Sequence, residues 1–194
     1  MKIESLTFHH ISMPLVAAFE TSFGRETVRE CIIIEIRSEG LIGWGECVAS
    51  YNPGYNYETT GTAMHILKEF ISPLILGKDI KDALDFQKHV EGIRGHHLAK
   101  AGVEMALWDL IGKREGKSLK QLFGGVREKV EVGVSVGIQE SPQKMVETVT
   151  DFVNSGYARV KIKIKPGKAV AESQAVRNAF PNIRLQVDAN SAFK

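Results

Sequence analysis

The sequence is poor in several features that mark whole classes of protein. It has 2 cysteines, Cys31 and Cys47, among 194 residues, too few for a disulfide framework and not spaced as the Cys-x-x-Cys pair of a zinc site. We therefore expect both to be small, buried apolar side chains. Proline is also scarce, at 6 residues, while 43% of the residues are hydrophobic. This composition is typical of a folded globular protein and excludes a disordered or collagen-like chain.

Long apolar runs and an excess of one charge are missing as well. No run of 18 apolar residues occurs, and residues 1–10 lack the continuous hydrophobic stretch of a signal peptide. We therefore expect a cytoplasmic protein with no membrane partner. The 25 Lys and Arg against 23 Asp and Glu leave a formal net charge of +2, which is too balanced for a dedicated nucleic-acid-binding protein.

The pattern of apolar residues predicts an α+β unit over residues 1–125. The first 50 residues favour strands, and the spacer Ser38-Glu39-Gly40 favours a hairpin. From Glu58 onward the apolar spacing becomes helical until Gly124 and Gly125. The expected strands are 1–13, 31–37 and 41–50, the expected loops are 19–24 and 51–56, and the expected helices lie near 64–71, 83–90, 98–114 and 118–123.

Residues 126–194 have a different pattern, in which strands alternate with helices. Expected strands cover 130–137, 159–164 and 183–188, and expected helices cover 141–154 and 168–179. Strand, helix and strand in short alternation are typical of parallel β/α units. We therefore predict two domains, an α+β domain over residues 1–125 and a partial β/α barrel over residues 126–194.

Each of the three later strands has an aliphatic face opposite a polar face. If the helices cover the aliphatic faces, the polar faces point inward as in a barrel lumen. Ser135, Lys161, Lys163 and Asp188 then lie toward the carboxyl ends of the strands, where β/α barrels place their active sites. The alternative is the solvated polar face of an open sheet, on which lysines are common.

The polar residues of this face suit proton abstraction. Two neighbouring ammonium groups, on Lys161 and Lys163, each disfavour the charge on the other, so that one of them could act as a base near neutral pH. A carboxylate such as Asp188 beside them is a ligand that a hard divalent cation prefers. One carboxylate alone makes a poor metal site.

Two motifs resemble a known superfamily. The segment 159–167, Arg-Val-Lys-Ile-Lys-Ile-Lys-Pro-Gly, and the segment 185–190, Leu-Gln-Val-Asp-Ala-Asn, closely resemble the Lys-x-Lys strand and the first metal-ligand strand of the enolase superfamily. The nearest likeness is to its o-succinylbenzoate synthase/N-acylamino acid racemase subfamily. Short segments at 13–16, 21–24, 43–47, 106–110 and 133–138 also fit, so the resemblance extends over nearly all of the chain.

The resemblance implies a fold and a set of site residues. The fold is an α+β capping domain followed by the first β/α units of an incomplete TIM-like barrel. The implied catalytic residues are Lys163 as the base and Lys161 as its partner, and Asp188 is the implied first ligand of Mg²⁺ or Mn²⁺, which would stabilise an enediolate. The implied substrate-binding residues are Phe19, Phe23 and Tyr55 in capping loops, together with Ser135 and Asn190. Ordinary packing of the loop aromatics is the alternative for the first three.

The activity implied by the resemblance is that of an Mg²⁺-dependent o-succinylbenzoate synthase of menaquinone biosynthesis. Lys163 would take the α-proton of a small carboxylate and return it to the departing hydroxide. N-Acylamino acid racemase activity is a further expectation, which needs a second base on the opposite face. The alternatives are another racemase, a dipeptide epimerase or a muconate cycloisomerase of the superfamily, or a non-catalytic module that needs a partner chain.

The chain is short for the complete fold, since a closed β/α barrel takes about 200 residues or more. Only three barrel strands are expected, and the later acidic metal ligands and the opposing lysine of the superfamily are not among these residues. We therefore expect the N-terminal portion of an enzyme that is a homo-oligomer when complete. By itself this polypeptide is expected neither to bind Mg²⁺ tightly nor to turn over substrate.

Overall fold

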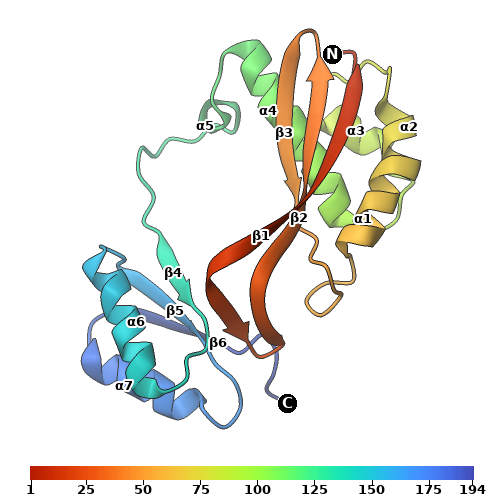
Figure 1. Ribbon diagram of the computed structural model, residues 1–194. Coiled ribbons are helices and arrows are strands. Elements are labelled where there is room, and N and C mark those ends of the chain that lie inside the picture. The colour runs from red at the N-terminus through yellow and green to blue at the C-terminus, as the bar shows by residue number, and fades with distance from the viewer. The chain divides into compact units, whose positions relative to one another are not determined.

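The computed structural model describes residues 1–194, which form two compact units (Figure 1). The first unit comprises Met1–Met13 and Arg29–Val126, and the second comprises Pro14–Val28 and Arg127–Lys194. The segment Pro14–Val28, which the sequence division left with the N-terminal part, thus groups with the C-terminal part. The division into domains at residue 126 stays a prediction.

Three strands form the first sheet, in the order β1-β2-β3. They are β1 Ser5–Thr21, β2 Gly24–Ser38 and β3 Leu41–Cys47, with β2 and β3 antiparallel. The expectation of a loop at 19–24 is wrong, because β1 and β2 continue to a tight turn at Ser22 and Phe23. Thr21 Oγ1 accepts the Phe23 N–H at 3.2 Å. Pro14 is tolerated within β1 because this strand lies at the edge of the sheet.

The helices that follow β3 are more broken than the apolar spacing indicates. They are α1 Thr60–Ile66, the π-helical turn η1 Leu67–Ile71, α2 Ser72–Ile75, α3 Ala83–His89, α4 His97–Glu115 and α5 Leu119–Leu122. The helix expected near 64–71 does not end at residue 71, since helical turns continue through Pro73 to Ile75. The helical turn before Pro73 is the wider π-helical turn η1, in which the Ser72 backbone N–H donates to Leu67 O, five residues earlier. The Ser72 hydroxyl donates to the same oxygen. The helix passes through Pro73 because that residue lies in the first turn of α2, where a missing N–H costs little.

The longest helix, α4, packs directly on strand β3 through glycines. A Cβ at Gly45 would lie 2.0 Å from Gly102 O, and one at Gly43 would lie 2.2 Å from Ala106 O. Only glycine therefore permits this approach of helix and strand. The buried core of this unit joins apolar residues of β2 and β3 to those of α4 and the earlier helices. Both Cys31 and Cys47 are buried free thiols, as expected.

The second unit contains a parallel sheet in the order β4-β5-β6. Its elements are β4 Gly133–Val136, α6 Pro142–Asn154, β5 Arg159–Lys163, α7 Ala169–Ala179 and β6 Arg184–Asp188. Strand β4 is shorter than the expected 130–137, because its pairing begins at Gly133 opposite Arg159, where β5 itself begins. None of the helices in the chain is both long and apolar enough to span a membrane.

The aliphatic faces of β4 and β5 are covered by α6 and α7, as the sequence pattern predicts. Val136, Val160 and Ile162 are buried in one cluster with Met145 of α6 and Val176 of α7. Strand β6 departs from this pattern, because Val187, which alternation places on the aliphatic face, is 47% exposed. The helices of this unit thus fix which face of β4 and β5 is polar and open.

Candidate active site at the ends of the parallel strands

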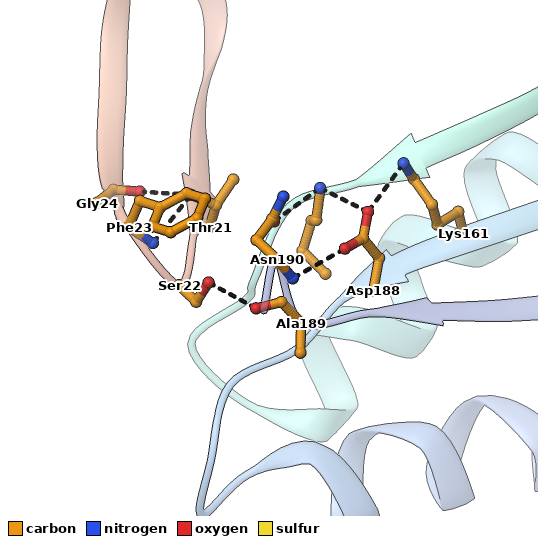
Figure 2. Close-up of polar contacts among 9 residues, drawn as sticks. Thr21, Ser22, Phe23, Gly24, Lys161, Asp188, Ala189 and Asn190 are labelled. Carbon is orange, nitrogen blue, oxygen red and sulfur yellow. Dashed lines mark hydrogen bonds and ion pairs between the residues drawn. The ribbon is translucent and has the colours of Figure 1, made fainter. Parts of the chain in front are cut away.

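The polar face of β5 and β6 brings two lysines onto one carboxylate (Figure 2). Lys163 is paired in register with Asp188, and Lys161 lies two residues earlier on the same face. Lys163 Nζ donates to Asp188 Oδ2 at 2.8 Å, and Lys161 Nζ lies 3.1 Å from the same oxygen. Three residues that the sequence pattern places on one polar face thus form one cluster of direct contacts.

Burial distinguishes the two lysines. The Lys163 side chain is 8% exposed, whereas that of Lys161 is 32% exposed. Burying an ammonium group is costly unless charged or polar partners replace water. Lys163 has two such partners, because Asn190 Oδ1 accepts a second hydrogen bond from its Nζ at 2.8 Å.

Asp188 is held in its ionised form. The hydrogen bond from Lys163 is the largest cause that lowers its pKa, followed by those from the Asn190 backbone N–H and from Lys161. Asn190 N donates to Asp188 Oδ1 at 2.9 Å. Asn190 itself has φ 48°, in the left-handed region that asparagine tolerates better than most residues. This backbone conformation lets one residue contact both Asp188 and Lys163.

The turn between β1 and β2 also reaches this end of the sheet, which sequence reasoning missed. The part of the β1–β2 hairpin that belongs to the second unit is Pro14–Val28, and we call it the hairpin tip. Ser22 Oγ donates to Ala189 O at 2.7 Å (Figure 2), and Ile138 N donates to Glu20 O at 2.9 Å. A third contact joins Lys165 Nζ to Glu20 Oε1 at 3.0 Å. In the sequence, Lys165 follows Lys161 and Lys163 at the same spacing of two residues. This spacing was the one sequence feature that could have indicated a role for Lys165 at the site.

The remaining predicted site residues are placed as follows. Phe19 and Phe23 lie on the hairpin tip, where Phe19 is half-buried and Phe23 is exposed. Ser135 is exposed on β4 and is paired in register with Lys161. Tyr55 is exposed and belongs to the first unit. The second unit thus contains every predicted site residue except Tyr55.

The residues present suit one ligand of a divalent cation but not a complete site. Asp188 offers an ionised carboxylate, which is the donor that Mg²⁺ prefers. No group of three or more His, Cys, Asp or Glu residues in the chain could hold a metal ion. Further ligands would therefore have to come from substrate, water or residues outside this chain.

Comparison with known proteins identifies the family. Residues 2–124 match the model described as "Mandelate racemase / muconate lactonizing enzyme, N-terminal domain". An o-succinylbenzoate synthase of Geobacillus kaustophilus is 41% identical over 194 residues, which cover 100% of this chain and 52% of the relative. An N-succinylamino acid racemase of Thermus thermophilus is 42% identical over 193 residues, again covering 100% and 52%. The chain thus spans about half the length of the curated relatives it matches.

Solved structures agree. A member of the enolase superfamily from Listeria innocua matches with a TM-score of 0.92 and 38% identity, covering 100% of this chain and 53% of that one. A dipeptide epimerase of Enterococcus faecalis, solved with Mg and a dipeptide, matches with a TM-score of 0.90 and 27% identity, covering 100% and 55%. The expected fold, a capping domain followed by the first β/α units, is confirmed. The chain therefore belongs to the mandelate racemase / muconate lactonizing enzyme family of the enolase superfamily and carries the N-terminal domain of that family.

Proposed function

We propose that the protein containing this chain abstracts the proton next to a carboxylate in a small-molecule substrate, with Lys163 as the base. The observation that carries the proposal is the contact at 2.8 Å between the buried Lys163 Nζ and Asp188 Oδ2. A lysine held in this way at the carboxyl ends of parallel strands lies where β/α barrels perform their chemistry. The names of the two curated relatives are consistent with such a reaction.

The roles of the neighbouring residues follow from charge. Removing an α-proton leaves negative charge on the substrate carboxylate, and Lys161 supplies a positive charge two residues from the base. Mg²⁺ or Mn²⁺, when bound, would supply the larger part of this stabilisation. Asp188 is the ligand that this chain would contribute, and Asn190 orients Lys163 through its side-chain oxygen.

The specific activity we propose is o-succinylbenzoate synthesis, as a step of menaquinone biosynthesis, with racemisation of N-succinylamino acids as a second activity. Both reactions begin with the same proton abstraction. In the dehydration, Lys163 then protonates the departing hydroxide, so the proton that it removed leaves as water. In the racemisation, a base on the opposite face returns a proton to the same carbon. The names of the two curated relatives support one activity each.

We propose that the substrate is held by the hairpin tip and the strand ends together. Phe19 and Phe23 offer apolar contacts, while Ser135 and Asn190 offer hydrogen bonds on the polar face. Tyr55 is proposed as a further substrate-binding residue of the complete enzyme, which we expect to be a homo-oligomer. This combination suits a substrate with an apolar ring or side chain beside its reacting carboxylate.

The test is the substitution Lys163→Ala in the full-length protein. We expect it to lower both dehydration and exchange of the substrate α-proton with solvent deuterium by about a hundredfold to ten-thousandfold, the usual contribution of a general base. Proton NMR follows both reactions. Lys144→Ala, which removes an exposed lysine of α6 paired with Glu147, is the matched control and should leave both rates unchanged. Undiminished exchange in Lys163→Ala would refute the assignment of the base.

The isolated polypeptide 1–194 is proposed to be inactive, because Asp188 is one carboxylate and no cluster of three candidate ligands is present. Purified 1–194 should therefore show no dehydration of the cyclohexadiene precursor of o-succinylbenzoate. Isothermal titration with Mg²⁺ should likewise show no tight binding. Measurable turnover by this polypeptide would contradict the proposal.

A further inference from the structure

The hairpin tip contacts the ends of all three strands of the parallel sheet. After β4, Ile138 N donates to Glu20 O at 2.9 Å, and after β6, Ala189 O accepts from Ser22 Oγ at 2.7 Å. The acceptor in both contacts is a main-chain carbonyl. The third contact, after β5, joins Lys165 Nζ to Glu20 Oε1 at 3.0 Å and is the one of the three that depends on two charged side chains.

The tip also packs closely on Gly137, the residue after β4. A Cβ at Gly137 would lie 3.0 Å from Glu20 N, 3.2 Å from Glu20 O and 3.3 Å from Phe19 Cδ2. Gly137 is buried, and its φ is not positive, so space and not backbone conformation disfavours a side chain here. Contact with the end of β4 thus fixes Phe19, while both contact and charge fix Glu20.

We propose that Lys165 is a positioning residue, which through its ion pair with Glu20 holds Phe19 in place to bind the apolar part of the substrate. Lys165 follows Lys163, the proposed base, by two residues. The ion pair therefore connects the strand that carries the base to the tip. This role rests on the proposed function, in which Phe19 and Phe23 contact the substrate. Lys165 acts through Glu20, and no covalent step is involved.

The kinetic effect of such a residue differs from that of a base. The apolar part of the substrate takes no part in proton abstraction, so contacts with it stabilise the substrate and the transition state alike. Loss of the ion pair should therefore raise KM and leave kcat unchanged. The side chains of Lys165 and Glu20 are 37% and 28% exposed, and an ion pair of this exposure changes an equilibrium by about two- to fivefold.

The experiment measures exchange of the substrate α-proton with solvent deuterium in the full-length protein, with N-succinylphenylalanine and N-succinylalanine as the probes. Lys165→Met and Glu20→Gln should each raise KM for the phenylalanine derivative by about two- to fivefold. KM for the alanine derivative, which has no large apolar group, should change less. The double variant should equal either single one, because both break the same pair. Lys165→Arg keeps the charge and should restore KM.

Gly137→Ala tests the same role by contact instead of charge. The new methyl group would press on Glu20 and Phe19, so KM for the phenylalanine derivative should again rise at unchanged kcat. Lys144→Met, which removes an exposed ion pair of α6, is the control and should change neither constant. An equal rise of KM for both probes, a lower kcat at unchanged KM, or no effect of Lys165→Met would each overturn the proposal.

Hydrogen exchange at the Ile138 amide, whose acceptor is Glu20 O, tests the anchoring of the tip without substrate. Exchange should be about two- to fivefold faster in Lys165→Met and in Glu20→Gln, while the amide of the buried Val149 in α6 should exchange equally in all variants. Unchanged exchange at Ile138 would overturn the anchoring role even in an active enzyme. Absence of α-proton exchange by the unsubstituted protein would instead refute the proposed function, and with it the role of Lys165 in substrate binding.

Discussion

Lys163 and Asp188 lie side by side on neighbouring parallel strands, with Nζ 2.8 Å from Oδ2. The register that pairs them also places Lys161 on the same face, so that two ammonium groups contact one carboxylate, which offsets one of their two positive charges. Asn190, in the loop after β6, accepts a hydrogen bond from Lys163 through its side chain and donates one to Asp188 through its backbone N–H. The charge balance of the candidate site therefore depends on Asp188.

Asp188→Asn should destabilise the second unit at neutral pH by about 1–3 kcal/mol, because the buried Lys163 loses its charged partner. Since the folded-state pKa of Asp188 is lowered, its contribution is complete above the unfolded-state pKa of about 3.9 and is lost as pH falls further. Urea unfolding followed by circular dichroism at neutral and strongly acidic pH measures this difference. Asp151→Asn, at an exposed position of α6, is the control. An equal loss from Asp188→Asn at both pH values would contradict the prediction.

Gly45→Ala should destabilise the first unit by about 3 kcal/mol, because the new methyl group overlaps the backbone of α4. Its Cβ would lie 2.0 Å from Gly102 O and 2.7 Å from Ala106 N. The fluorescence of Trp44 and Trp108, both in this unit, reports its unfolding in urea. Gly61→Ala, where the nearest atom is 3.8 Å away, should change stability by less than about 1 kcal/mol. Equal midpoints for the two variants would argue against a glycine contact between helix and strand.

Cys31 and Cys47 should not react with a thiol reagent in the native protein at pH 8. Burial is the largest cause that raises the pKa of both thiols, that of Cys47 to about 11, and the thiolate is the reactive form. Titration with a chromogenic disulfide should therefore give no native signal from these two residues. Both should react once the protein is unfolded in guanidinium chloride, and fast labelling of either thiol in the native state would contradict their burial.

Asp109→Ala should expose the outer edge of β3. Asp109 Oδ2 accepts the Trp44 N–H at 2.8 Å, and Lys113 Nζ bridges Ile42 O at 2.7 Å and the same carboxylate at 2.6 Å. We expect a loss of about 1 kcal/mol, faster hydrogen exchange at Trp44, and self-association through the uncovered edge. Light scattering detects the association. Asp109→Asn, which retains an acceptor oxygen, should exchange more slowly at Trp44 than Asp109→Ala does.

Local patterns in the sequence were sufficient for the elements whose structure depends on near neighbours. The helical spacing predicted 98–114, and α4 covers His97–Glu115. Alternation along two strands placed Lys161, Lys163 and Asp188 on one polar face, which the sheet register confirms. The expected loop at 19–24 failed because the pairing of β1 with β2 extends both strands beyond their local signals.

The amino-acid sequence by itself determined the helices α4, α6 and α7, the polar face of the later strands and the superfamily, because each depends on residues close together along the chain. Only the tertiary structure decided that the hairpin tip meets the strand ends. Glu20 and Lys165 are 145 positions apart, and Ser22 and Ala189 are 167 apart. The tertiary structure also left Glu172 buried without a hydrogen-bond partner. Such contacts depend on how distant segments pack, which no local periodicity encodes.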